Sequence, residues 1–254
     1  MIATKILKIL ILLIIFPQCG CYHNKKSDKS EKMINYRYHV EQAVKLPAIN
    51  SEWDKRFWED AETISLRNYM GSRPVHFPET NAMLKYDDNH IYVIFKVKDQ
   101  YVKAIAKGIN GKVWQDSCVE FFFIPGTDIS RGYFNFELNC KGIFLFEYHT
   151  NNGSKTGFVD KEDYSKIVVS HSLDIDVEQE VIEPVTWTVE YCLPFSILEH
   201  YMEVDKPVPG TLWRANFYKC ADKTSQPHWL TWAPVDYHKP KFHLPQFFGW
   251  LEFR

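Results

Sequence analysis

Polar side chains alternate with apolar ones near the middle of the chain, in an arrangement that could recognise hydroxyl groups. Within residues 133–140, Asn135, Glu137 and Asn139 occupy every second position. Successive side chains of a β-strand point to opposite faces, so these three groups would lie side by side on one face of a sheet. Amides offer donors and acceptors and carboxylates offer acceptors, a combination suited to neighbouring hydroxyls. We therefore expect a ligand-binding face rather than a merely solvated one.

Two other segments would extend this polar face. Residues 118–124 alternate in the same way, and pairing with the first segment would add Glu120 to the polar row. Residues 212–220 present Arg214 and Asn216 on the face opposite their apolar residues. The predicted polar face therefore consists of Glu120, Asn135, Glu137, Asn139, Arg214 and Asn216.

Tryptophan residues border these strands. Trp114 lies just before residues 118–124, and Trp229 and Trp232 lie in a segment bounded by prolines, residues 227–234. A loop Trp more often packs against a core than binds a ligand. Here, however, the rings adjoin strands that already present polar groups, so we expect them to form aromatic surfaces beside the site.

Two other classes of function could use residues in this chain. Glu120 and Glu137 could act as the carboxylate pair of a glycoside hydrolase, which requires a separation of about 5–9.5 Å. The face of a sandwich, however, would lack the enclosed cleft that raises the pKa of one carboxyl. A haem-binding electron-transfer domain could use Met70, Met83 or Met202 as a ligand. We expect a non-catalytic site.

The composition limits the class of protein. The chain has 254 residues, of which 45% are hydrophobic and 16% aromatic, with a formal net charge of −2. This length and apolar content allow one domain with a sizeable core, and the aromatic content favours strands. The near-neutral charge argues against a nucleic-acid-binding protein. His228, His238 and His243 do not have the spacing of a zinc site, so we expect them to be loop or surface groups.

The elements that must position these groups are short strands. No long segment has helical periodicity, and residues 194–198 would form at most one helical turn. The pattern predicts an all-β fold, a single-domain antiparallel β-sandwich or jelly roll with immunoglobulin-like layers. The expected strands cover residues 36–41, 81–86, 91–98, 118–124, 133–140, 143–148, 167–172, 177–182, 187–192, 212–220 and 249–253.

The first segment has the pattern of a bacterial lipoprotein signal. Lys5 and Lys8 precede an apolar run, residues 9–16, that is too short to span a bilayer. A Gly-Cys pair ending at Cys21 follows and resembles a lipobox, with Cys19 as the alternative lipidated residue. We expect an exported protein anchored by lipid to the cell envelope, at the outer membrane or cell surface. The chain would comprise a signal peptide at 1–21, a flexible tether at 22–35 and one domain at 36–254.

Export would permit disulfides among the remaining cysteines. Cys118, Cys140, Cys192 and Cys220 show no C-x-x-C spacing, and three of them lie in strand-like runs. Buried free thiols are therefore the expectation, while one bridge of unassigned pairing stays open.

The polar strands and the Trp residues described above belong to a set of sequence motifs that resembles carbohydrate-binding module family 9 over nearly the whole of the expected domain, residues 36–254. Asn50 and Ser51 stand where the family's opening P-x-I-D-G-x-x-D has Asp-Gly. The similar segments are residues 47–54, the W-x-D-S-x-V-E strand at 114–122, the Y-h-x-F-E-h-N-x-x-G strand at 133–142, and the closing blocks at 228–234 and 242–253.

The resemblance implies a β-sandwich that clamps a terminal sugar between two Trp rings. It assigns one ring to Trp114 and the hydroxyl contact to Glu120, with Trp232 or Trp229 as the second ring and Trp232 preferred. Many relatives bind structural calcium, which this sequence neither supports nor excludes. The implied role is capture or breakdown of polysaccharide, which suggests glycan-degrading enzymes as partners.

Overall fold

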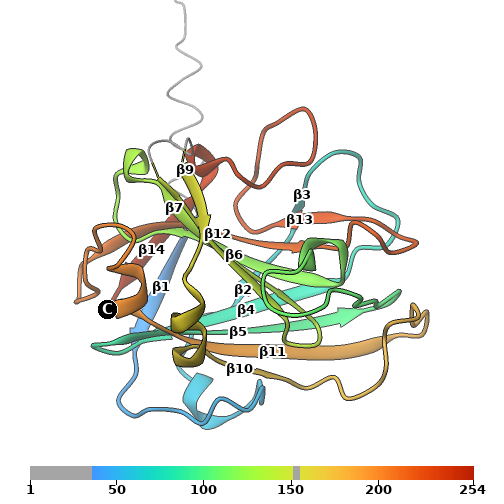
Figure 1. The fold of residues 1–254 in the computed structure, drawn as a ribbon, viewed down its shortest axis with the longest axis horizontal. Coiled ribbons are helices and arrows are strands. Elements are labelled where there is room, and N and C mark those ends of the chain that lie inside the picture. Colours follow the sequence, from blue (N-terminus) through green and yellow to red (C-terminus); the bar gives the residue numbers. More distant parts are fainter. Residues whose placement is uncertain (1–35, 151–154) are drawn as a thin grey trace, which may run out of the picture.

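The alternating segments pair into two β-sheets that pack face to face (Figure 1). The computed structural model describes residues 36–150 and 155–254. The back sheet contains β10 (Val168–His171), β11 (Val185–Pro194), β5 (His90–Asp99), β4 (Glu79–Tyr86) and β2 (Ile64–Ser65). The front sheet contains β14 (Gly249–Phe253), β12 (Leu212–Cys220), β6 (Cys118–Ile124), β7 (Tyr133–Asn139), β8 (Phe144–Thr150), β9 (Lys155–Phe158), β13 (Trp229–Thr231) and β3 (Asn68–Tyr69).

β1 (Arg37–Gln42) joins the two sheets along one side of the sandwich. Its first half pairs with β14, with Arg37 opposite Trp250, and its last residues pair with β4, with Glu41 opposite Lys85. Both pairings are parallel. The predicted sandwich is therefore confirmed, but the expectation of purely antiparallel strands is wrong at β1. Alternation along a strand reports its faces and does not report its direction.

Aromatic side chains fill the space between the sheets. Phe136 of the front sheet stacks on Tyr191 of the back sheet at a centroid distance of 4.4 Å, and Phe217 lies 6.1 Å from Phe95. Phe121 stacks on Phe217 at 4.9 Å. The alternation had placed these front-sheet rings on the core face, and the structure confirms it. The polar row therefore lies on the outer face of the front sheet.

A second apolar layer covers that outer face. The segment after β13 runs over it, so that Phe242 stacks on Tyr218 at 4.1 Å and His243 lies 5.0 Å from the ring of Phe122. The layer buries the polar row between the front sheet and this segment. Of the six predicted polar groups, all except Arg214, which is partly exposed, are thus withdrawn from bulk water.

Most of the predicted strands are present, with one predicted strand absent and four short strands that were not predicted. Residues 177–182 form no strand and contribute only the isolated bridge between Val181 and Val102. β2, β3, β9 and β13, which were not predicted, have two to four residues each, too few for a recognisable period. The helical turn expected at 194–198 is α2 (Phe195–Leu198).

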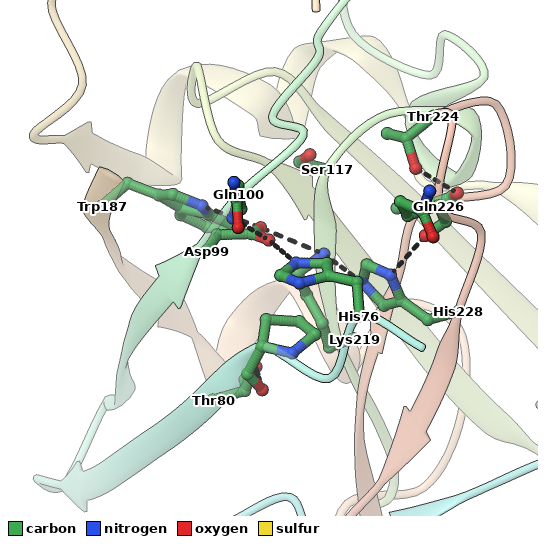
Figure 2. A network of polar contacts seen from close by, with 12 residues as sticks. His76, Thr80, Asp99, Gln100, Ser117, Trp187, Lys219, Thr224, Gln226 and His228 are labelled. Carbon is green, nitrogen blue, oxygen red and sulfur yellow. Dashed lines mark hydrogen bonds and ion pairs between the residues drawn. The ribbon is translucent and has the colours of Figure 1, made fainter. Parts of the chain in front are cut away.

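A buried ionic network ties the two sheets together at one end of the sandwich (Figure 2). The Nζ of Lys219 in β12 lies 3.4 Å from Asp99 Oδ2 in β5 and 2.8 Å from His228 Nε2. Asp99 also accepts a hydrogen bond from Trp187 Nε1 at 3.2 Å and pairs with His76 Nε2 at 2.8 Å. Because side chains alternate along β12, Lys219 points away from the outer face that carries Cys220. The network therefore belongs to the core and not to the polar row.

This network includes one of the three late histidines, which were expected to be loop or surface groups. His228 lies in a loop, as expected, but it is buried there, with only 2% of its surface exposed. Its Nδ1 lies 2.9 Å from the carbonyl of Gln226 and its Nε2 faces the Lys219 ammonium, so the ring is neutral with its proton on Nδ1. Burial, followed by the charge of Lys219, lowers the pKa of His228 to about 3. His238 is exposed, as expected.

The cysteines of the described residues are buried free thiols, in agreement with the expectation from their spacing. Cys21, the signal peptide at 1–21 and the tether at 22–35 lie outside the described residues. Within the described part of the chain, no helix has the length and apolar character needed to cross a membrane.

Candidate functional site

A cavity of about 260 Å³ opens on the outer face of the front sheet. Glu120, Glu137 and Cys220, from β6, β7 and β12, form its floor, and Trp114 and Trp229 stand at its side. The remaining lining residues are Leu145, Glu147, Asp222, Pro240, Lys241, Phe242 and His243.

Two acidic side chains lie directly opposite each other on the floor. Glu120 and Glu137 are paired residues of β6 and β7, and they are only 2% and 5% exposed. Cys220 Sγ donates to Glu120 Oε1 at 3.0 Å, and Asn135 Nδ2 donates to Glu137 Oε1 at 3.0 Å. The second oxygen of each carboxyl, Oε2, is buried without a hydrogen-bond partner among the described residues. A ligand in the cavity could supply these missing donors.

Burial raises the pKa of both Glu120 and Glu137 well above the usual carboxyl range. The expectation that this face lacks an environment able to raise a carboxyl pKa is therefore wrong, because the segment at 240–243 covers it. Burial also raises the pKa of Asp222 at the cavity wall. The floor is consequently a place where a negative charge is unfavourable unless a donor or a cation arrives.

Asn135 positions the acidic groups from behind the cavity. Its Nδ2 donates to Glu137 and also to Glu147 Oε2 at 3.3 Å, while its Oδ1 lies 2.8 Å from His149 Nε2. Burial raises the pKa of Glu147, but hydrogen bonds with His149 and Asn135 outweigh it and hold the pKa below its usual value. Asn135 itself does not line the cavity, so it acts by orienting Glu137 and Glu147.

The two Trp rings beside the cavity are held by a shared backbone arrangement. Trp229 Nε1 donates to Asp222 Oδ1 at 2.8 Å, and Asp222 N donates to the Trp114 carbonyl at 3.3 Å. Cys220 Sγ adds a contact of 3.4 Å to the same carbonyl. Both rings are partly buried against the outer layer. The bond to Asp222 thus orients the Trp229 ring, and the backbone at Trp114 is held next to the same residue.

A second cavity of about 620 Å³ adjoins the first. Glu147, Lys241 and His243 line both, so the two cavities share a boundary. Tyr133 forms part of its wall and stacks on His149 at 4.4 Å. The other residues that line the second cavity are Ile129, Gly132, Pro245 and Gln246.

The sequence of this chain matches one known protein family over most of its length. The family model described as carbohydrate-binding family 9 matches residues 61–253. The chain belongs to carbohydrate-binding family 9. No curated protein shows significant sequence similarity to it.

Solved structures agree with the family 9 assignment. A protein of Bacteroides uniformis, provisionally described as carbohydrate-binding, is 30% identical with a TM-score of 0.77, over 86% of this chain and 99% of that one. A family 9 module of Caldicellulosiruptor kristjanssonii in complex with cellotriose is 18% identical with a TM-score of 0.55, over 86% and 93%. The same organism's module with glucose is 17% identical with a TM-score of 0.55, over 86% and 95%. The latter two similarities establish the fold alone.

The conspicuous Asp and Asn of the family 9 motifs have structural roles here. Asp116 accepts backbone hydrogen bonds from Ile105 and Ala106 at 2.9 and 3.1 Å, and Asn139 Nδ2 donates to it at 2.9 Å. Asn139 Oδ1 accepts from the backbone nitrogens after β7, including that of Ile143 at 3.0 Å. Asn139, predicted as a site residue, therefore fixes a turn and a loop and does not line the cavity.

Three other predicted site residues also lie away from the cavity lining. Arg214 donates to the backbone carbonyls around β14 and lies 4.3 Å from the centroid of Trp250. Asn216 exchanges hydrogen bonds with the backbone of Ala233 at 3.1 and 2.9 Å. Trp232 packs in the core between the sheets. The first two side chains satisfy backbone groups that the chain turns would otherwise leave unpaired.

Sequence reasoning missed Glu147, Asp222, Lys241 and His243 at the cavity. Glu147 alternates with apolar residues in β8 next to β7, a signal that could have identified it. The other three lie in irregular segments without a period. His243 lies in a loop, as expected, where it lines both cavities, and burial lowers its pKa to about 4.

The one group of potential metal ligands that converges in the described part of the chain does not fit calcium. Among the described residues, one group of three His, Cys, Asp or Glu side chains converges within 4.8 Å, and it consists of Cys118, Glu120 and Cys220. Calcium prefers six to eight oxygen ligands, whereas this group offers two thiols. The methionines considered for haem lie apart, since Met70 and Met83 are buried in separate clusters and Met202 packs against the main core.

Proposed function

We propose that the cavity beside Trp114 and Trp229 binds one sugar unit of a glycan and that the protein is a non-catalytic glycan-capturing module. The observation that carries this proposal is that Glu120 and Glu137, each with a buried Oε2 that has no partner among the described residues, line a cavity flanked by indole rings. A pyranose has apolar C–H faces and a hydroxyl rim. The rings suit the faces, and the carboxyl oxygens suit the rim.

The expected affinity is moderate. Partial burial of a ring face contributes about 1.5–3 kcal/mol, and each sugar hydrogen bond adds about 0.5–1.5 kcal/mol. After the ordering of ligand and side chains, the dissociation constant should lie between mM and µM. The family 9 neighbours with bound cellotriose and glucose support a saccharide ligand. The adjoining cavity leaves space for a neighbouring unit of the chain.

Replacing Trp229 with alanine should weaken sugar binding about 10- to 100-fold, because the sugar loses one ring face. Trp229 is chosen as the second ring in place of Trp232 because it lines the cavity. Trp114→Ala should have a similar effect. Calorimetric titration of the full chain with glycans that bind in an array measures the change. Trp53→Ala, on the far side of the back sheet beside Lys96, is the matched control and should bind normally.

One observation favours a hydrolase as a second candidate. A hydrolytic pair needs one protonated and one ionised carboxyl. Glu137, with its raised pKa, and Glu147, with its lowered pKa, show such a split and share Asn135. Release of reducing sugar by the wild type, abolished in Glu137→Gln, would identify a hydrolase. Binding without release supports the module.

We further propose that Cys21 carries a lipid that anchors the protein to the bacterial cell envelope. The support is the apolar run at 9–16 followed by a Gly-Cys pair. Cys21→Ser should block processing or release the protein from the membrane fraction, as immunoblots of fractionated cells would show. Cys19→Ser is the control and should remain processed and anchored. The reverse result would assign the lipid to Cys19.

A further inference from the structure

The lining of the cavity contains four acidic side chains and one lysine. Glu120 and Glu137 face each other, and Asp222 stands beside them at the wall. Lys241 also lines the cavity, but it is exposed and lies 5.9 Å from the Tyr237 ring. His243 is neutral at physiological pH because burial lowers its pKa to about 4. The site is therefore deficient in cationic donors.

The unsatisfied atoms define what the ligand must bring. Two buried acceptors, Glu120 Oε2 and Glu137 Oε2, have no partner among the described residues, and both side chains line the cavity. A hydroxyl group supplies one donor and no charge. An ammonium group supplies three donors and a positive charge, so one group can serve both oxygens and stabilise the ionised form of a carboxyl. The indole rings of Trp114 and Trp229 are also compatible with a cation.

We propose that the sugar recognised in this cavity carries a free amino group, which binds as an ammonium between Glu120 and Glu137. The ligand is thus a hexosamine unit whose nitrogen is not acetylated. This inference rests on the proposed sugar site. A hard metal cation that needs oxygen ligands is a poorer match, because the carboxylates of Glu120, Glu137 and Asp222 do not converge within 4.8 Å as a group in the described part of the chain.

Binding of an ammonium would change the protonation of the floor. Burial favours the neutral carboxyls in the free protein, since it raises the pKa of both Glu120 and Glu137. As the ammonium enters, a carboxyl O–H bond breaks, its proton goes to the buffer, and the resulting carboxylate pairs with the ammonium. A neutral sugar would leave the carboxyl protons in place. Proton release on binding therefore distinguishes the two ligand classes.

Calorimetric titration of the full chain at pH 6.5 with glucosamine, glucose and N-acetylglucosamine tests the inference. We expect glucosamine to bind at least tenfold more tightly than the other two, with proton release seen as a heat that differs between phosphate and Tris buffers. Glu137→Gln should remove the preference. Glu252→Gln, on β14 away from the cavity, is the matched control and should retain it.

The outcomes separate this inference from the proposed function. Equal affinity for glucose and glucosamine, both weakened in Trp229→Ala, would overturn the ammonium site and leave the sugar site intact. A preference that persists in both Glu137→Gln and Glu120→Gln would also overturn it. If none of the sugars binds, the proposed function itself is contradicted. Because proton release is measured on the wild type, the test does not depend on the folding of a variant.

Discussion

Replacing Lys219 with methionine should lower the free energy of unfolding by about 3–5 kcal/mol, because it removes one partner of a fully buried ion pair. The ammonium is 0% exposed and contacts Asp99 Oδ2 at 3.4 Å and His228 Nε2 at 2.8 Å. Methionine preserves most of the side-chain volume, but it removes the ammonium group that pairs with the Asp99 carboxylate and donates to His228 Nε2. Urea denaturation of the full chain measures the loss.

Lys98→Met is the matched control for this prediction. Lys98 lies in β5 and pairs with Glu79 at 3.0 Å, but both side chains are more than half exposed, so this pair should contribute about 0–1 kcal/mol. A loss below about 1 kcal/mol in Lys219→Met would mean that solvent reaches the network after all.

The pH dependence of the same network has a definite sign. Burial raises the pKa of Asp99, but the charge of Lys219 and the bond to His76 outweigh it and hold the pKa well below its usual range. A depressed carboxyl pKa stabilises the fold above the unfolded value of about 3.9, and that stabilisation is lost as the pH falls towards the folded pKa. The deficit of Lys219→Met relative to the wild type should therefore shrink in acid.

Trp232→Ala should lower the free energy of unfolding by about 3–5 kcal/mol and leave sugar affinity unchanged, the opposite of the result expected for Trp229→Ala. The Trp232 ring is 8% exposed and packs edge-on against Tyr36 at 5.9 Å and Phe217 at 5.6 Å. A Cβ at Gly249 would lie 2.8 Å from this ring, so the packing there is already close.

Thermal melts and calorimetric titration of Trp232→Ala together measure the two properties. Trp250→Ala is the control, since Trp250 is half-buried and stacks on Arg214 outside both cavities. It should lose much less stability than Trp232→Ala. Weakened sugar binding in Trp232→Ala without a lower melting temperature would contradict the assignment of this ring to the core.

Periodic segments could be interpreted from the sequence because each strand buries one face. The alternation in residues 118–124 and 133–140 separates the core rings from the polar row, and the opposition of Glu120 and Glu137 follows from pairing the two strands. The same alternation cannot separate a ligand contact from a structural one. Asn139 and Asn216 share the row, yet their amides satisfy backbone groups of the neighbouring loops.

The predictions that failed concern short or irregular segments, because nothing in the local sequence specifies where such a segment folds. Trp229 and Trp232 are three residues apart in one segment, but one lies at the cavity and the other in the core. Asp222 and His243 reach the cavity through the path of their loops. The burial of His228 was not predictable for the same reason, since it depends on how its loop folds against Lys219 of β12, the strand that pairs with β13.

The position of β1 has a consequence for how the chain reaches this structure. Its pairing with β14 joins the first and last described strands, a contact of very large sequence separation, which is slow to form because of the entropy of closing so long a loop. Until it forms, β14 presents an unpaired edge, and β4, which β2 covers only at Asn81 and Ala82, leaves Lys85 and Tyr86 unpaired; such edges favour association with other chains. Docking of β1 therefore both closes the sandwich and removes two sites of aggregation in one step.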